Sequence, residues 1–262
     1  MSQKVVVITG GSAGIGAALG EEVGRRGGRV VLAARREREL EAARARAGAE
    51  AIAVVADVTR REDSAKIFEA AIARFGQVDV WVNNAGRGIS RQVSELTDQD
   101  IDDMMLVNLK SALYGIQAVL PHFKERRSGH IVNVSSMLGR VPFATIRSAY
   151  SAAKHALNSL TANLRMELRV EFPAIHVTCV LPGVVATDFG KNALHGGPDS
   201  RTLPQAQPVE EVAAVIADVI EKPRADVYTR PEARGMVAAY YSAEDLAELE
   251  SRPPFAARPP RP

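Results

Sequence analysis

The stretch Val5-Val-Val-Ile-Thr9-Gly-Gly-Ser-Ala-Gly14-Ile-Gly16 decides the fold class, because an apolar run enters a glycine-rich turn directly before a helical pattern. Its first four residues are apolar without alternation, as expected for a parallel strand that is buried on both faces. The glycines allow a tight turn and a close approach of the backbone to a pyrophosphate, and a helix N-terminus supplies free N–H groups. The stretch therefore predicts a strand, a phosphate-binding turn and a helix, with a purely structural turn as the alternative.

Short β-branched runs alternate with longer helical patterns along the rest of the chain. The expected strands are 5–8, 29–33, 51–55, 78–82, 130–134 and 176–181, with a short edge strand at 226–229. The expected helices are 14–26, 36–47, 61–75, 98–126, 148–171 and 209–221. This alternation predicts a doubly wound parallel sheet of Rossmann type, with three α/β/α layers and one domain over residues 1–250.

Two segments break this alternation. Residues 187–208 are rich in Gly, Pro and polar side chains and are too long for an ordinary connection, so we expect a lid loop. Residues 251–262 are rich in Pro and Arg, and we expect a disordered tail.

The composition narrows the class of protein. The chain has 262 residues, 46% hydrophobic and 24% charged, with a net charge of +2, which predicts a soluble globular protein. This charge favours neither nucleic acid nor a membrane as partner, and the apolar run at the start is too short for a signal peptide. The single cysteine, Cys179, excludes an internal disulfide and fits a reducing compartment, so we expect a cytoplasmic protein. The five histidines lack ligand spacing, so no metal is expected.

The end of the second strand bears on the choice of dinucleotide. NAD sites usually place an acidic residue there, whereas this chain reads Leu32-Ala-Ala34-Arg35-Arg36. Because arginine can bind a 2′-phosphate with paired hydrogen bonds, NADP(H) is favoured, with NAD(H) possible. The alternative is that Arg35 and Arg36 only begin a charged helix face. Asp57 can accept a bond from an adenine amino group or serve as a turn residue.

Tyr150-Ser-Ala-Ala-Lys154 places a phenol and an ammonium group on one helix face. A free phenol has a pKa of about 10, and a cation fixed beside it lowers that value. The pair therefore predicts a proton-transfer device, although the spacing alone also arises by chance.

Five motifs in order give the chain a resemblance to the short-chain dehydrogenase/reductase family in its basic single-domain form. They are Thr9-Gly-x-x-x-Gly14-x-Gly16, Asn83-Asn-Ala-Gly86, Asn108, Ser136 upstream of Tyr150-x-x-x-Lys154, and Pro182-Gly183-x-x-x-Thr187. The resemblance runs from about residue 4 to 187, and more weakly to about residue 230.

The resemblance implies a catalytic set of Asn108, Ser136, Tyr150 and Lys154. Tyr150 would be the general acid/base, Lys154 would lower its pKa and bind the nicotinamide ribose, and Ser136 would bond the substrate oxygen. Asn108 would bend its helix and hold a water-linked proton path. Ser135 competes for the serine role, but the family serine precedes a glycine by three residues, and Gly139 fits only Ser136.

The expected cofactor-binding residues cluster at the strand ends. They are Gly10, Ser12, Gly14, Ile15, Gly16, Arg35, Arg36, Asp57, Val58, Asn84, Ala85, Gly86, Tyr150, Lys154, Pro182, Gly183, Val185 and Thr187. The expected substrate side is mostly apolar and comprises Met137, Leu138, Val141, Phe143, Val184 and Phe189. Arg87 and Arg91 either meet an anionic group or are exposed charges.

These residues predict an NADP(H)-dependent oxidoreductase that reduces a ketone or aldehyde to an alcohol, with Tyr150 as the acid. One alternative is an NAD-dependent alcohol dehydrogenase of the same fold. Another is a catalytically silent regulator that binds a dinucleotide. The partner is a small carbonyl or alcohol substrate, and the resemblance implies a homodimer or homotetramer.

Overall fold

Seven parallel strands form one sheet in the part of the chain that the computed structural model describes, residues 1–253, 255 and 256. The strands are β1 (Val5–Thr9), β2 (Arg29–Ala34), β3 (Ala51–Val55), β4 (Val80–Asn83), β5 (Gly129–Val134), β6 (Ile175–Leu181) and β7 (Asp226–Tyr228). Their order across the sheet is β3-β2-β1-β4-β5-β6-β7. The predicted doubly wound parallel sheet is confirmed.

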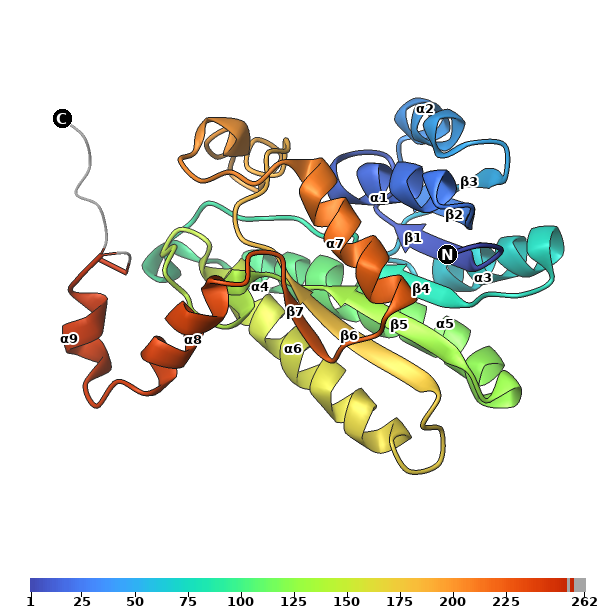
Figure 1. The fold of residues 1–262 in the computed structure, drawn as a ribbon. Helices are drawn as coiled ribbons and strands as arrows, with labels where there is room; N and C mark the ends of the chain where they lie inside the picture. The colour runs from blue at the N-terminus through green and yellow to red at the C-terminus, as the bar shows by residue number, and fades with distance from the viewer. Residues whose placement is uncertain (254, 257–262) are drawn as a thin grey trace.

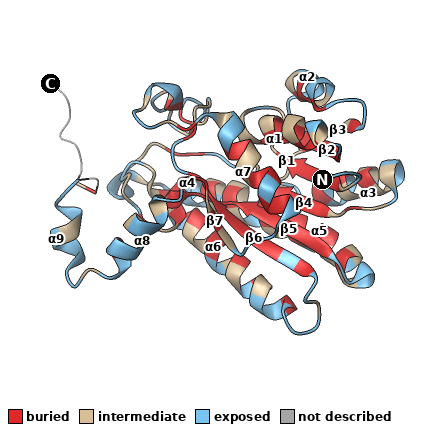
Figure 2. Cartoon of the chain, in the orientation of Figure 1, coloured by how far each residue is buried: buried red, intermediate tan, exposed pale blue. Residues whose placement is uncertain are grey.

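Helices cover both faces of the sheet and complete three layers (Figure 1). Helices α1 (Gly14–Arg25), α2 (Glu37–Ala47) and α7 (Val209–Glu221) lie on one face, and α3 (Arg61–Phe75), α5 (Ser111–Arg126) and α6 (Ser148–Leu168) on the other. Alternate residues of β1 enter the two apolar layers, because Val6 and Ile8 face α1 while Val5 and Val7 face the opposite side. The strands are buried and the outer helix faces are exposed (Figure 2).

The sheet reverses its winding between β1 and β4. Strand β1 pairs with β2 on one side and with β4 on the other, so the connections leave in opposite directions. Such a switch point leaves a crevice at the carboxyl ends of the strands. The predicted glycine turn after Thr9 and the turn after Asn83 therefore meet at one place.

The helix predicted over 98–126 is interrupted in its middle. Helix α4 (Asp98–Met105) passes into a π-helical turn, Leu106–Lys110, before α5 begins. The Asn108 side chain donates to the Met104 carbonyl at 3.1 Å, an oxygen that in an α-helix accepts the Asn108 backbone N–H. The prediction of one continuous helix was wrong here because a side chain competes with the backbone ladder.

Two C-terminal helices, α8 (Ala233–Tyr241) and α9 (Leu246–Glu250), were not predicted. Tyr240 of α8 packs with Val141 and Phe255 in a small separate cluster, so α8 is positioned by a distant segment. Phe255 belongs to the tail predicted to be disordered, yet it is buried in this cluster. The rest of that predicted tail includes residues 254 and 257–262, which lie outside the described residues.

A chain of buried polar side chains links the sheet to α6. Trp81 donates to the Asn83 amide oxygen at 2.8 Å, and Asn83 donates to the Asn133 amide oxygen at 2.8 Å. Asn133 then donates to the Thr161 hydroxyl at 2.9 Å, and Thr161 donates to the Leu157 carbonyl at 2.6 Å. Each group is satisfied only while its neighbour is present, so the chain fixes how α6 sits on β4 and β5.

We predict that Asn133→Ala lowers the free energy of unfolding by about 2–4 kcal/mol, because it leaves a buried donor on Asn83 and a buried acceptor on Thr161 without a partner. Urea denaturation measures the change. The exposed Asn163 is the control, since Asn163→Ala should change the free energy by less than about 0.5 kcal/mol. Equal urea midpoints for the two variants would show that the polar chain adds no stability.

Candidate active site

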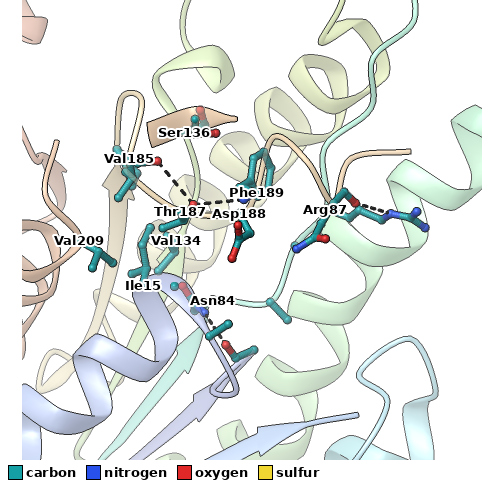
Figure 3. Close-up of a pocket in the computed structure, with 18 of the residues that line it drawn as sticks. Ile15, Asn84, Arg87, Val134, Ser136, Val185, Thr187, Asp188, Phe189 and Val209 are labelled. Atoms are coloured by element: carbon teal, nitrogen blue, oxygen red, sulfur yellow. Dashed lines mark hydrogen bonds between the residues drawn. The ribbon is translucent and has the colours of Figure 1, made fainter. Parts of the chain in front are cut away.

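A cleft of about 1920 Å³ opens at the carboxyl ends of β1, β4, β5 and β6. Figure 3 shows side chains converging on it from α1 (Ile15), the turn after β4 (Asn84), the segment after β5 (Ser136) and the segment after β6 (Thr187). A single drug-sized ligand usually occupies about 300–1,000 Å³. The cleft is therefore large enough for a dinucleotide together with a small substrate.

The glycine turn is built so that its backbone can approach a ligand in the cleft closely. Gly10 has φ +68°, a conformation that favours glycine. A Cβ on Gly16 would lie 2.6 Å from the Asn84 amide nitrogen, so no side chain fits there. Asn84 itself donates to the Thr9 carbonyl at 2.9 Å and holds the turn against β4.

Helix α1 starts with free N–H groups aimed at the cleft. Its N-cap residue, Ala13, has no capping side chain, and the first turn carries no acidic residue. A helix start of this kind favours an anion, because unpaired donors and the helix dipole both attract negative charge. The turn and the helix start therefore fit a pyrophosphate.

The end of β2 presents two arginines and no carboxylate of its own. Arg36 donates to the Ser12 hydroxyl of the glycine turn at 3.3 Å. Arg35 lies 3.8 Å from the Asp57 carboxylate and is otherwise exposed. The second Asp57 oxygen accepts from the Thr59 backbone N–H at 3.0 Å, which is the turn role considered for this residue.

Tyr150 and Lys154 are almost completely buried on one face of α6, as their spacing predicts. The Lys154 ammonium lies 5.7 Å from the centre of the Tyr150 ring. It donates to the Val134 carbonyl at the end of β5 at 2.9 Å. The pair is thus fixed between helix and sheet at the floor of the cleft.

Burial sets the proton affinities of this pair. It raises the pKa of Tyr150 to about 12, although the nearby Ser136 hydroxyl and the charge of Arg147 act to lower it. Burial also lowers the pKa of Lys154 to about 8. The expected lowering of the Tyr150 pKa by Lys154 is therefore not seen in the protein alone: burial raises this pKa, and the opposing influences come from Ser136 and Arg147.

The two candidate serines have different surroundings. The Ser135 hydroxyl donates to the Lys154 carbonyl at 3.4 Å and is directed at the helix backbone. The Ser136 hydroxyl accepts from the Leu138 backbone N–H at 3.1 Å and is close enough to the phenol to lower the pKa of Tyr150. The geometry therefore places Ser136, and not Ser135, beside the Tyr150 phenol.

Asn108 lies directly behind the cleft. Its amide donates to the Arg87 carbonyl at 3.0 Å and accepts from the Arg87 backbone N–H at 3.2 Å. A Cβ on Gly86 would lie 2.8 Å from the Asn108 oxygen and 3.6 Å from the Lys154 ammonium. The π-helical turn thus brings Asn108 toward Lys154, where the resemblance expects it.

The predicted lid segment, 187–208, lies over the substrate half of the cleft. The Phe189 ring meets the Tyr150 ring edge to face, with centres 5.4 Å apart. Leu194 exchanges backbone bonds with the segment after β4, and His195 contacts the buried carboxylate of Asp100 at 2.7 Å. That this segment moves as a lid stays a prediction.

Most of the predicted site residues come together. Of the expected cofactor residues, all except Gly16 line the cleft, and Gly16 shapes the turn from behind. Of the expected substrate residues, Val141 was placed wrongly, because it is buried under Tyr240 and Phe255. Arg91 pairs with Asp100 at 3.0 Å, which accounts for its charge within the protein.

Arg147 also lines the cleft, although the sequence analysis did not predict it as a site residue. Its only signal in the sequence is a position three residues before Tyr150, which by itself does not distinguish it from a surface charge.

The described residues contain no group of three or more His, Cys, Asp or Glu side chains arranged to hold a metal ion. No helix in this part of the chain is long and apolar enough to cross a membrane.

Comparison with known proteins agrees with this site. The chain is 35% identical over 243 residues to the uncharacterized oxidoreductase YxnA of Bacillus subtilis. The aligned region covers 90% of this chain and 68% of that protein. A short-chain dehydrogenase/reductase of Burkholderia phymatum, solved in complex with NAD, superimposes on this chain with a TM-score of 0.86 at 25% identity. The superposition covers 98% of each chain.

An alcohol dehydrogenase of the archaeon Thermococcus sibiricus, complexed with 5-hydroxy-NADP, has a TM-score of 0.74 at 25% identity over 87% of this chain and 96% of that one. Residues 4–196 match the short chain dehydrogenase family. The match takes in the glycine turn, Asn108, Ser136, Tyr150 and Lys154. The chain therefore belongs to the short-chain dehydrogenase/reductase family.

Proposed function

We propose that this oxidoreductase uses NADP(H) to reduce a carbonyl compound to an alcohol. The observation that carries the proposal is a buried Tyr150, with Ser136 and Lys154 beside it, at the end of a cleft whose other end is a phosphate-binding turn. When bound, the nicotinamide supplies the hydride. The glycine turn and the start of α1 would hold its pyrophosphate.

The side chains at the cleft floor suit proton donation. In the protein alone, a pKa of about 12 keeps Tyr150 protonated at neutral pH, so the phenol is a proton donor. Ser136 and Tyr150 can both donate to the oxygen of a carbonyl as negative charge develops on it. Lys154, held at the Val134 carbonyl, places a positive charge behind the phenol as it loses its proton.

The choice of NADP(H) rests on the end of β2. Arg36 reaches the Ser12 hydroxyl, and Arg35 lies on the same rim, where an acidic residue would repel a 2′-phosphate. The rival is NAD-dependent oxidation of an alcohol on the same fold, and the Burkholderia phymatum protein was solved with NAD. Kinetic efficiency with both cofactors on a panel of ketones, aldehydes and alcohols separates the two readings. Tight cofactor binding without turnover on that panel would instead favour a silent regulator.

Tyr150→Phe should lower kcat by about 10²- to 10⁴-fold, because it removes the proton donor and leaves the ring in place. The Kd for NADPH, measured by fluorescence, should change little. Tyr114→Phe is the control, since Tyr114 stacks on Arg61 outside the cleft and should retain full activity. Normal turnover in Tyr150→Phe would disprove the mechanism.

The rate of carbonyl reduction should fall as the pH rises through about 8. Burial lowers the pKa of Lys154 to about 8, so its positive charge is present below that pH and lost above it, while Tyr150 stays protonated. Initial rates at saturating substrate, followed from about pH 6 to 10, measure the profile. A rate that is level to the upper end of this range would rule out a role for the Lys154 charge.

Arg36→Ala should raise the Kd for NADPH by about 10- to 100-fold and change that for NADH by less than about threefold, because only NADPH carries the 2′-phosphate. Arg38→Ala is the matched control, because Arg38 is an exposed arginine of the same helix that does not line the cleft. An equal rise in the Kd for NADPH and the Kd for NADH in Arg36→Ala would mean that Arg36 does not bind the 2′-phosphate.

A further inference from the structure

Arg147 is a half-buried arginine next to Tyr150 that has no acidic partner among the described residues. It precedes the first residue of α6 and lines the cleft. Arg201 of the lid lines the same cleft but pairs with Asp188 at 2.5 Å and Asp199 at 3.0 Å. The charge of Arg201 is therefore balanced within the protein, whereas that of Arg147 is not.

One side of the Arg147 guanidinium is fixed and the other is open. Nη1 donates to the Ile89 carbonyl at 3.0 Å and to the Ser90 hydroxyl at 3.1 Å. Nε and Nη2 make no hydrogen bond to the described residues, and neither is among their fully buried unpartnered atoms. A guanidinium held in this way presents two adjacent donors, the arrangement that binds a carboxylate or phosphate with two parallel bonds.

Two glycines place this guanidinium close to the reacting phenol. A Cβ on Gly88 would lie 2.9 Å from the Phe189 ring and 3.0 Å from Arg147 Nη1, so ring and guanidinium are neighbours. The same Phe189 ring packs on Tyr150. A Cβ on Gly197 of the lid would lie 3.2 Å from Nη2. Gly197 therefore lets the lid backbone come close to Nη2 with no side chain between them.

The surroundings leave the Arg147 charge without compensation. Burial lowers the pKa of Arg147, and the nearby phenol of Tyr150 opposes this shift. An unpaired charge out of water is unfavourable unless a counter-charge arrives. Two acidic residues line the substrate half of the cleft, and each has another partner. Asp188 is paired with Arg201, and Asp103 accepts a bond from Gln99 at 2.9 Å.

We propose that the substrate carries an oxyanion, a carboxylate or a phosphate, that Arg147 binds through Nε and Nη2 while the carbonyl oxygen meets Tyr150 and Ser136. This inference rests on the proposed carbonyl reduction. Arg87 adds positive charge at the mouth of the cleft, where its side chain meets the lid at the Asn192 carbonyl (Figure 3). Arg147 is thus assigned as a specificity-determining residue.

The test compares charged and neutral substrates that differ only at the anionic group. A homologous series of keto acids is assayed beside their methyl esters, and a ketone phosphate beside its parent hydroxyketone, so that carboxylate and phosphate are distinguished. The wild-type kcat/KM should favour the anionic member of at least one pair. Arg147→Gln should lower kcat/KM for that member by about 10- to 100-fold, mainly through KM, and change that of its neutral partner by less than about threefold.

Two further variants separate charge recognition from structural support. Arg147→Lys keeps the charge without the planar pair of donors and should restore part of the preference. Arg201→Gln, at the paired arginine, should leave the preference unchanged. A thermal unfolding midpoint for Arg147→Gln near that of the wild type confirms that its loss of activity is not a loss of folding.

Each other outcome identifies what failed. Esters reduced as well as acids by the wild type, or an equal loss on both in Arg147→Gln, would overturn the anion site and leave carbonyl reduction standing. If no compound is reduced, the proposed function fails. Calorimetric binding of the keto acids and the ketone phosphate to the NADP⁺-loaded protein then decides the anion site. Binding lost in Arg147→Gln supports the site, and no binding to the wild type refutes it.

Discussion

The hydrogen bonds between the end of β1 and the turn after β4 fix the position of the whole cleft. The Thr9 hydroxyl accepts from the Asn84 and Ala85 backbone N–H groups at 3.0 and 3.1 Å, and the Asn84 side chain returns a bond to the Thr9 carbonyl. The winding of the sheet reverses here, and the two turns also meet where Asn84 donates to the Gly10 carbonyl at 3.4 Å. The space for a pyrophosphate, the start of α1 and the path to Lys154 are all set from this junction.

At the end of the cleft that holds Tyr150 and Lys154, burial shifts the pKa values of both side chains. Tyr150 and Lys154 lie out of water, which favours the neutral form of each, yet the lysine keeps a hydrogen bond to the Val134 carbonyl. Lys154 is therefore held where a modest change in local charge alters its protonation, while Tyr150 stays protonated. Arg147 adds a fixed positive charge on the phenol side. In the function proposed above, the site would therefore join proton donation to selection of substrate charge.

The segment over the cleft is anchored outside the reacting centre. Thr97 caps α4, and the buried Asp100 carboxylate accepts from the Thr97 backbone N–H. The same carboxylate binds Arg91 and His195, so it ties the lid segment to the helix beside it. With its far part held there, the lid places Phe189 on Tyr150 and Gly197 over Arg147. The segment over the cleft thus has its fixed points on α4 and on the chain after β4.

The sequence by itself determined the succession of strands and helices as far as β7, the glycine turn and the face shared by Tyr150 and Lys154, because these depend on local periodicity and backbone geometry. Family motifs then supplied Asn108 and Ser136. Only the tertiary structure decided the π-helical turn at Asn108, the burial of Val141 under Tyr240 and Phe255, and the direction of the Tyr150 pKa. It alone singled out Arg147, because whether an arginine is paired or unpaired depends on residues far away in the chain, which local spacing does not report.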